Sequence, residues 1–105
     1  MPTLLYVAHA DSIHTARSAA IFVDRGWDVH IVPSIEYGYL HPAFRNVTVH
    51  HVTYTKKNPD ATTHGRHLPN PVMRVANALV RHCPPVHVRH LVQVIDRVHP
   101  DIIYS

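Results

Sequence analysis

Residues 4–17 read LLYVAHADSIHTAR, and this stretch decides the fold. An unbroken apolar run ends at His9, small and polar side chains follow, and from Ile13 onward apolar residues recur at helical spacing. Open α/β sheets build ligand sites in this way, because the polar turn between strand and helix lies at the carboxyl end of the strand. The free N–H groups at the start of the helix also attract anions.

The elements on either side of this turn predict a complete strand–helix–strand unit. Asp11 or Ser12 is a good N-cap for the helix. Its apolar positions share one face: Ile13, Ala16, Ala19 or Ala20, and Val23. Gly26 ends the helix as a left-handed residue, and a second strand follows at residues 27–32. Such a unit is expected to have a right-handed crossover.

The middle of the chain predicts one more strand between two loops. Residues 46–54 (NVTVHHVTY) are rich in β-branched side chains, and their alternation slips at His50-His51, which predicts a bulge or an edge location. Residues 34–45 and 55–69 contain proline, glycine and many polar or aromatic side chains. We expect both to be loops, the second one exposed and mobile.

The last third predicts two helices and a final strand. Asn70-Pro71 begins the first helix, and Pro84-Pro85 ends it. Its expected core stripe is Val72, Val75, Ala76, Leu79 and Val80. A second helix begins near Val86, with the expected stripe Val88, Leu91, Val92, Ile95 and Val98. Residues 101–105 (DIIYS) open the strand.

This order of elements predicts an α/β fold. We expect a Rossmann-like three-layer sandwich whose mostly parallel sheet has about four strands in the order 3-2-1-4. The first and last strands then lie side by side, and their connections leave on opposite faces of the sheet. Ligands of α/β proteins bind at such a switch point. The length of 105 residues suits one domain.

Composition narrows the class of function. The apolar fraction of 46% is that of a globular protein, and a single cysteine, Cys83, rules out an internal disulfide framework. We therefore expect a reducing compartment, the cytoplasm. The ten Lys and Arg residues are scattered, with Lys56-Lys57 as the only adjacent pair. Because nucleic-acid binding needs a dense basic face, we expect no nucleic-acid partner.

Nucleotide fingerprints are missing from the sequence. None of the three glycines lies in the first strand-to-helix turn, where a dinucleotide fold needs G-x-G-x-x-G and a P-loop needs a Gly-Lys-Ser/Thr ending. Glu36 lies a little beyond the second strand, where a dinucleotide fold has its ribose-binding acid. Without the glycines this reading of Glu36 is disfavoured.

The twelve histidines raise the question of a metal site. Two groups have spacings that could converge on a metal: His64 with His67, and His82 with His87 and His90. No carboxylate or second cysteine accompanies them in a recognised ligand pattern. We interpret them as surface histidines, and Cys83 as a structural thiol.

The turn after the first strand holds the candidate substrate-binding residues: Ser12, His14, Thr15 and Arg17. They lack the setting of a catalytic nucleophile, because no G-x-S-x-G elbow surrounds Ser12. Helix capping accounts for Ser12 or Asp11, but not for His14 and Arg17. These two lie three residues apart on the first helical turn, so both can face an anion. The sequence supports no assignment of a catalytic residue.

Three segments together resemble a known family. ADSIHTARSAAIFVDRGWDVHIVPS (10–34) is similar to the amino-terminal βαβ unit of family 4 retaining glycosyltransferases of the GT-B fold. RNVTVHHV (45–52) resembles the third strand of that family, and HLVQVIDRVHPDIIYS (90–105) resembles its helix-then-strand element. The loops at 34–45 and 55–69 match no part of the family pattern.

The resemblance implies an acceptor-binding domain of a sugar transferase. In GT-B enzymes a second domain binds the nucleotide-sugar donor, and transfer occurs in the cleft between the domains. Ser12, His14, Thr15 and Arg17 would face that cleft, near the donor diphosphate or a glycan or lipid-linked acceptor. The family usually needs no metal, so no cofactor is expected.

The resemblance also implies that residues 1–105 form a partial, acceptor-side domain. We expect this chain to have no transferase activity by itself, and to self-associate through its final strand and apolar helix faces. Peripheral contact of the Lys56-Lys57 loop with a membrane stays open. The alternative is a standalone α/β module that binds a ligand or another protein, because fold does not fix function.

Overall fold

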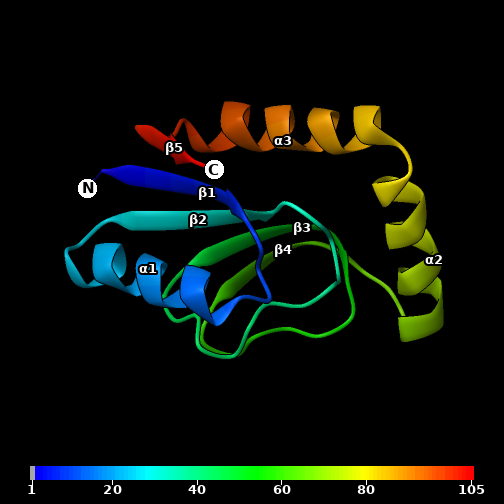
Figure 1. The fold of residues 1–105 in the computed structure, drawn as a ribbon, viewed down its shortest axis with the longest axis horizontal. Helices are drawn as coiled ribbons and strands as arrows, with labels where there is room; N and C mark the ends of the chain where they lie inside the picture. Colours follow the sequence, from blue (N-terminus) through cyan, green and yellow to red (C-terminus); the bar gives the residue numbers. More distant parts are fainter. Residues whose placement is uncertain (1) are drawn as a thin grey trace.

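Five parallel strands form one sheet in the order β4-β3-β2-β1-β5 (Figure 1). The computed structural model describes residues 2–105. The strands are β1 (Thr3–Ala8), β2 (Asp28–Pro33), β3 (Thr48–Tyr54), β4 (Thr62–His67) and β5 (Ile102–Tyr104). The helices are α1 (Ile13–Asp24), α2 (Asn70–Arg81) and α3 (Pro84–Val98). The expected Rossmann-like α/β class is confirmed.

β1 lies inside the sheet and is buried on both faces. Leu4 and Tyr6 belong to the core beneath α1, whereas Leu5 packs with Val32 and Val94 beneath α3. This two-sided burial explains why the apolar run of β1 is unbroken. α1 and α3 lie on opposite sides of the sheet (Figure 1).

α1 begins and ends as its sequence predicts. Ser12 has an extended backbone, and its side chain accepts a hydrogen bond from the Thr15 N–H, so Ser12 rather than Asp11 is the N-cap. Gly26 has a φ of 83°, the left-handed conformation that commonly ends a helix. The connection to β2 is therefore short, and β2 pairs with β1 along its whole length.

β4 is a strand that the sequence does not predict. Residues 62–67 were expected to be part of a mobile loop, but they pair with β3 from Thr48↔Thr62 to Tyr54↔His67. The expectation of about four strands is wrong by this one edge strand, while the predicted order of the other four is confirmed. The segment TTHGRH lacks apolar residues and is mostly exposed, so backbone pairing holds it in the sheet. Periodicity of apolar side chains cannot reveal such a strand.

The irregularity expected at His50-His51 is present. The pairing of β3 with β4 shifts register between His50 and Thr53. β3 itself is not at the edge of the sheet, because β4 covers it.

Two loops take the place of helices beside α1. Residues 34–47 connect β2 to β3, and residues 55–61 connect β3 to β4. The first loop adds Leu40 and Phe44 to the core beneath α1. Asn58 joins the two loops, because its side-chain amide donates hydrogen bonds to the carbonyl oxygens of His41 and Phe44.

α2 does not bury the face that its apolar spacing predicts. Met73 and Asn77 are buried, whereas Val72, Val75 and Leu79 are between 51% and 66% exposed. The predicted core stripe is therefore wrong. α2 lies at the right-hand end of the sheet in Figure 1, near the carboxyl ends of β2 and β3, and its inward residues meet polar partners there.

α3 differs from its predicted stripe in a smaller way. Leu91, Ile95 and Val98 pack toward the sheet around the buried Val94, but Val88 and Val92 are about half exposed. Pro84-Pro85 does not only end the preceding helix, because it also forms the first turn of α3. None of the helices within residues 2–105 is long and apolar enough to cross a membrane.

Candidate functional site

The carboxyl end of β1 lies at a switch point of the sheet. β1 pairs with β2 on one side and with β5 on the other. The chain leaves β1 for α1 on one face, and α3 returns to β5 from the other face (Figure 1). Ligands of α/β proteins bind where the connections diverge in this way.

The four residues predicted for this turn fall into two pairs. Ser12 and Thr15 are half-buried and are joined by the capping hydrogen bond of 3.5 Å. His14 and Arg17 are exposed on the first turn and a half of α1. Within residues 2–105, Arg17 has no carboxylate partner. Ser12 therefore serves the helix, while His14 and Arg17 are available to an external anion.

The loop after β2 supports the turn from one side. Ser34 N–H donates to the Ala8 carbonyl at 3.0 Å, and His41 N–H donates to the Ala10 carbonyl at 2.7 Å. The turn is therefore held by two backbone hydrogen bonds, one from the start of this loop and one from its middle. Its backbone is fixed without help from a ligand.

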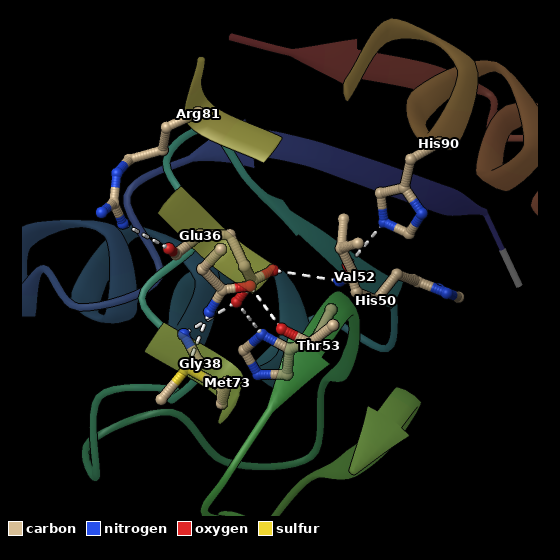
Figure 2. Close-up of polar contacts among 10 residues, drawn as sticks. Glu36, Gly38, His50, Val52, Thr53, Met73, Arg81 and His90 are labelled. Atoms are coloured by element: carbon tan, nitrogen blue, oxygen red, sulfur yellow. Dashed lines mark hydrogen bonds and ion pairs between the residues drawn. The ribbon is translucent and has the colours of Figure 1, made fainter. Parts of the chain in front are cut away.

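Glu36 is a buried centre of hydrogen bonds that sequence reasoning missed. Its side chain is 2% exposed and accepts a bond from the His51 ring at 2.7 Å. It also accepts bonds from the Gly38 N–H at 2.9 Å and the Val52 N–H at 3.1 Å (Figure 2). The carboxylate thus ties the end of β2 to β3. It does not face solvent, so a ribose-binding role is excluded. The one feature of the sequence that could have pointed to this role is that Glu36 is the only glutamate in the chain.

α2 packs on this centre through its two buried residues. Asn77 accepts a hydrogen bond from the Thr53 hydroxyl and donates one to the Met73 sulfur. Gly38 has a φ of 83°, and a Cβ there would overlap the Met73 side chain. Arg81, at the end of α2, donates to the Glu36 carbonyl at 3.4 Å. α2 is therefore fixed to β3 by the Asn77 bond, and to the loop after β2 by the Arg81 bond and the packing of Met73 on Gly38.

Three histidines form a row on the face of the sheet beneath α3. The ring of His50 on β3 stacks between those of His30 and His64, with ring centres 5.1 and 5.2 Å apart. His30 contacts His50 at 2.9 Å and Asp28 at 3.0 Å. From α3, the His90 ring bonds to the His50 carbonyl at 3.1 Å (Figure 2).

The environment of His50 disfavours its charged form. The pKa of His50 is lowered from 6.5 to about 3, mainly by burial and then by electrostatic repulsion from His30, His64, Arg97 and His90, in that order of importance. One ring nitrogen, Nδ1, is buried without a hydrogen-bond partner in the described chain. His50 is therefore neutral at pH 7.

The row does not have the geometry of a metal site. The nearest ring nitrogens of His30 and His50 are 2.9 Å apart, which is a hydrogen-bond distance, whereas two nitrogens bonded at about 2 Å to one tetrahedral metal ion lie about 3.3 Å apart. Across residues 2–105, no three His, Cys, Asp or Glu side chains are arranged to hold a metal ion. His64 and His67 have separate partners, His50 and the Thr55 carbonyl.

Comparison with known proteins found no matching family model, no matching curated protein and no matching solved structure. The fold itself defines the class, a Rossmann-like α/β domain with a five-stranded parallel sheet.

Proposed function

We propose that the chain is the acceptor-binding, N-terminal part of a glycosyltransferase, an enzyme that moves a sugar from a nucleotide-sugar donor to a glycan or lipid-linked acceptor. The observation that carries this proposal is the exposure of His14 and Arg17 at the carboxyl end of β1, beside β5. The resemblance to family 4 glycosyltransferases adds support. Its three segments correspond to the turn after β1 with α1 and β2, to most of β3, and to the second half of α3 with β5.

The residues of the turn suit the recognition of a phosphate-bearing ligand. The Arg17 guanidinium can donate two parallel hydrogen bonds to an oxyanion, and His14 can donate a third. The capped start of α1 adds a favourable dipole. In this proposal Ser12 and Thr15 fix the backbone of the turn, while His14 and Arg17 contact the donor diphosphate or the acceptor.

The test is an NMR titration of the chain with uridine diphosphate. We expect saturable shifts of the amide signals of residues 12–17, and their loss in the double variant His14→Ala, Arg17→Ala. Arg25→Ala, at the opposite end of α1, is the matched control and is expected to behave as the parent chain. Equal shifts in the parent chain and the double variant would overturn the assignment. A second readout is sugar-nucleotide turnover, which we expect to be absent in this chain alone.

Compartment and partners are part of the proposal. The cytoplasm suits an exposed free thiol, which Cys83 carries. Lys56 and Lys57 are both exposed and could touch an anionic membrane surface. Self-association stays a prediction, and β5 is its candidate contact because Ile102, Ile103 and Tyr104 are about half exposed. Sedimentation of the variant Ile103→Lys against the parent chain tests it.

A standalone binding module is the second candidate. The observation that favours it is a hollow at the carboxyl edge of the sheet whose walls all come from this chain. The coding sequence after Ser105 separates the two candidates. A continuing donor-binding domain favours the transferase, and a stop codon favours the module.

A further inference from the structure

A hollow of about 450 Å³ lies between α2 and the loop after β2. Its lining includes two tyrosines, two arginines and two asparagines: Tyr37, Tyr39, Arg74, Arg81, Asn70 and Asn77. These residues are separate from the turn after β1. The hollow has the size of small-molecule sites, and it lies near the carboxyl ends of parallel strands, where α/β proteins bind ligands.

The two arginines give the hollow a positive charge without internal compensation. Arg74 and Arg81 lie seven residues apart, two turns of α2, and both line the hollow. Within residues 2–105, the ion pair of Arg45 with Asp60 is the only one that an arginine or lysine forms. Neither Arg74 nor Arg81 therefore has a carboxylate partner. An oxyanion would supply one.

Arg81 is also held in place before any ligand binds. Its guanidinium lies 6.0 Å from the centre of the Tyr37 ring, and one of its N–H groups donates to the Glu36 carbonyl (Figure 2). This contact fixes the direction of the side chain and leaves other N–H donors for a ligand. Because the Arg81 guanidinium is already ordered, less side-chain entropy is lost when a ligand binds.

Tyr37 and Tyr39 supply flat apolar surfaces beside these charges. Each tyrosine is 43% exposed, although both belong to a loop that is anchored in the core. Partly exposed aromatic rings in a hollow stack against the flat face of a ring-shaped ligand. A ligand that matches this site has a ring for the tyrosines and a negative group for the arginines.

The walls of the hollow are rigid. The Glu36 carboxylate fixes the backbone around Tyr37 by bonding to the Gly38 N–H and to β3. On the opposite wall, Asn77 is 1% exposed and bonds to Thr53. Both walls are therefore ordered by the fold, which favours binding.

We propose that this hollow binds a small ring compound that carries an oxyanion, such as a sugar phosphate or a sugar carboxylate. The inference goes beyond the proposed function, because it requires no sugar transfer and uses none of the residues of the turn after β1. If the chain is a transferase part, the hollow is a candidate place for an anionic acceptor.

Isothermal titration calorimetry of the chain with four probes tests this inference: glucose 6-phosphate, glucuronate, glucose and inorganic phosphate. We expect saturable binding of at least one of the two charged sugars, and weaker binding of glucose and of phosphate alone. Tighter binding of glucose 6-phosphate assigns a phosphate ligand, and tighter binding of glucuronate assigns a carboxylate. Absence of saturable binding by both charged sugars would overturn the proposal.

Three variants separate a specific site from general charge attraction. Arg74→Gln, at a side chain that makes no hydrogen bond within residues 2–105, is expected to weaken binding of the charged sugar about tenfold. Tyr37→Ala is expected to weaken binding of the charged sugar more than binding of inorganic phosphate. Arg89→Gln removes the same charge from the exposed part of α3, outside the hollow, and is expected to change nothing.

Equal losses of affinity for the charged sugar in Arg74→Gln and Arg89→Gln would contradict a specific binding site in the hollow. Unchanged affinity in Tyr37→Ala would contradict the ring-binding role. The double variant His14→Ala, Arg17→Ala is expected to bind the charged sugar normally, so failure of the transferase proposal and failure of this one give different results.

Discussion

The two halves of the sheet are stabilised in different ways. β1 and β2 lie between α1 and α3, and their buried residues are aliphatic or aromatic side chains such as Leu5, Tyr6 and Ile31. β3 and β4 lie beside two loops and α2, and β3 carries buried polar groups such as His50, His51 and Thr53. The first half depends on apolar burial, and the second depends on hydrogen bonds that must be satisfied together.

This difference explains why the proposed ligand-binding residues of the hollow lie in the polar half of the sheet. Polar groups buried in a protein need partners, and a set of mutually bonded groups holds its members in fixed directions. Glu36 and its partners fix the loop that carries Tyr37 and Tyr39. The apolar half supplies a stable frame, and the polar half shapes the surface at the carboxyl edge.

The largest effect is expected from a substitution in the apolar half. Leu5 is fully buried between β1 and α3. Leu5→Ala removes buried methyl groups and leaves a cavity, which should lower the free energy of unfolding by about 4 kcal/mol. Urea denaturation followed by circular dichroism measures this change. A loss below about 1 kcal/mol would show that the core beneath α3 is not tightly packed.

Glu36→Gln is expected to have the next largest effect. The amide keeps the shape of the side chain but can accept at one end only, so its NH₂ group must face either the Val52 N–H or the donors at Gly38 and His51. The expected loss of stability is about 2 to 3 kcal/mol, because a buried donor loses its partner.

Asp60→Asn is the matched control for Glu36→Gln. It also replaces a carboxylate by an amide, but in an exposed pair with Arg45, so the change should stay below about 1 kcal/mol. Equal effects of the two substitutions would contradict the central role of Glu36. Urea denaturation compares them directly.

Acidification is expected to lower the free energy of unfolding through His50, which lies in the polar half of the sheet. His50 has a pKa of about 3 in the folded chain and an ordinary value near 6.5 when unfolded, so the unfolded state binds more protons between these values. Stability is therefore complete above pH 6.5 and falls as the pH drops toward 3. The loss from His50 alone is about 2 kcal/mol at pH 5.

His50→Gln isolates this effect from that of the other histidines. The groups that act on His50 are His30 on β2, His64 on β4, and His90 and Arg97 on α3, and Asp28 bonds to the far side of the His30 ring. The difference in unfolding free energy between pH 7 and pH 5 should shrink by about 2 kcal/mol in the variant. An unchanged difference would show that His50 titrates normally in the folded chain.

The same contrast decides what the sequence could predict. The unit from β1 to β2 follows from apolar runs, a capping serine and a terminal glycine, which are local signals, and the structure confirms it. β4 has no such signal, because its residues are polar and its pairing with β3 is made by the backbone. The contact of Glu36 with His51 and those of His50 with His30, His64 and His90 join residues 14 to 40 positions apart, and no spacing rule brings such residues together.

The smallest effect is expected on α2, where spacing and structure disagree. Leu79 belongs to the apolar stripe that periodicity assigns to the core, but it is 66% exposed. Leu79→Ala should change the free energy of unfolding by less than about 0.5 kcal/mol, as at other exposed positions. Leu5→Ala is the same substitution at a buried site, so the pair measures how far burial rather than residue type decides the cost. A loss of several kcal/mol at Leu79 would mean that α2 packs through its apolar stripe, and that the arrangement of Met73 and Asn77 against Gly38 and Thr53 is wrong.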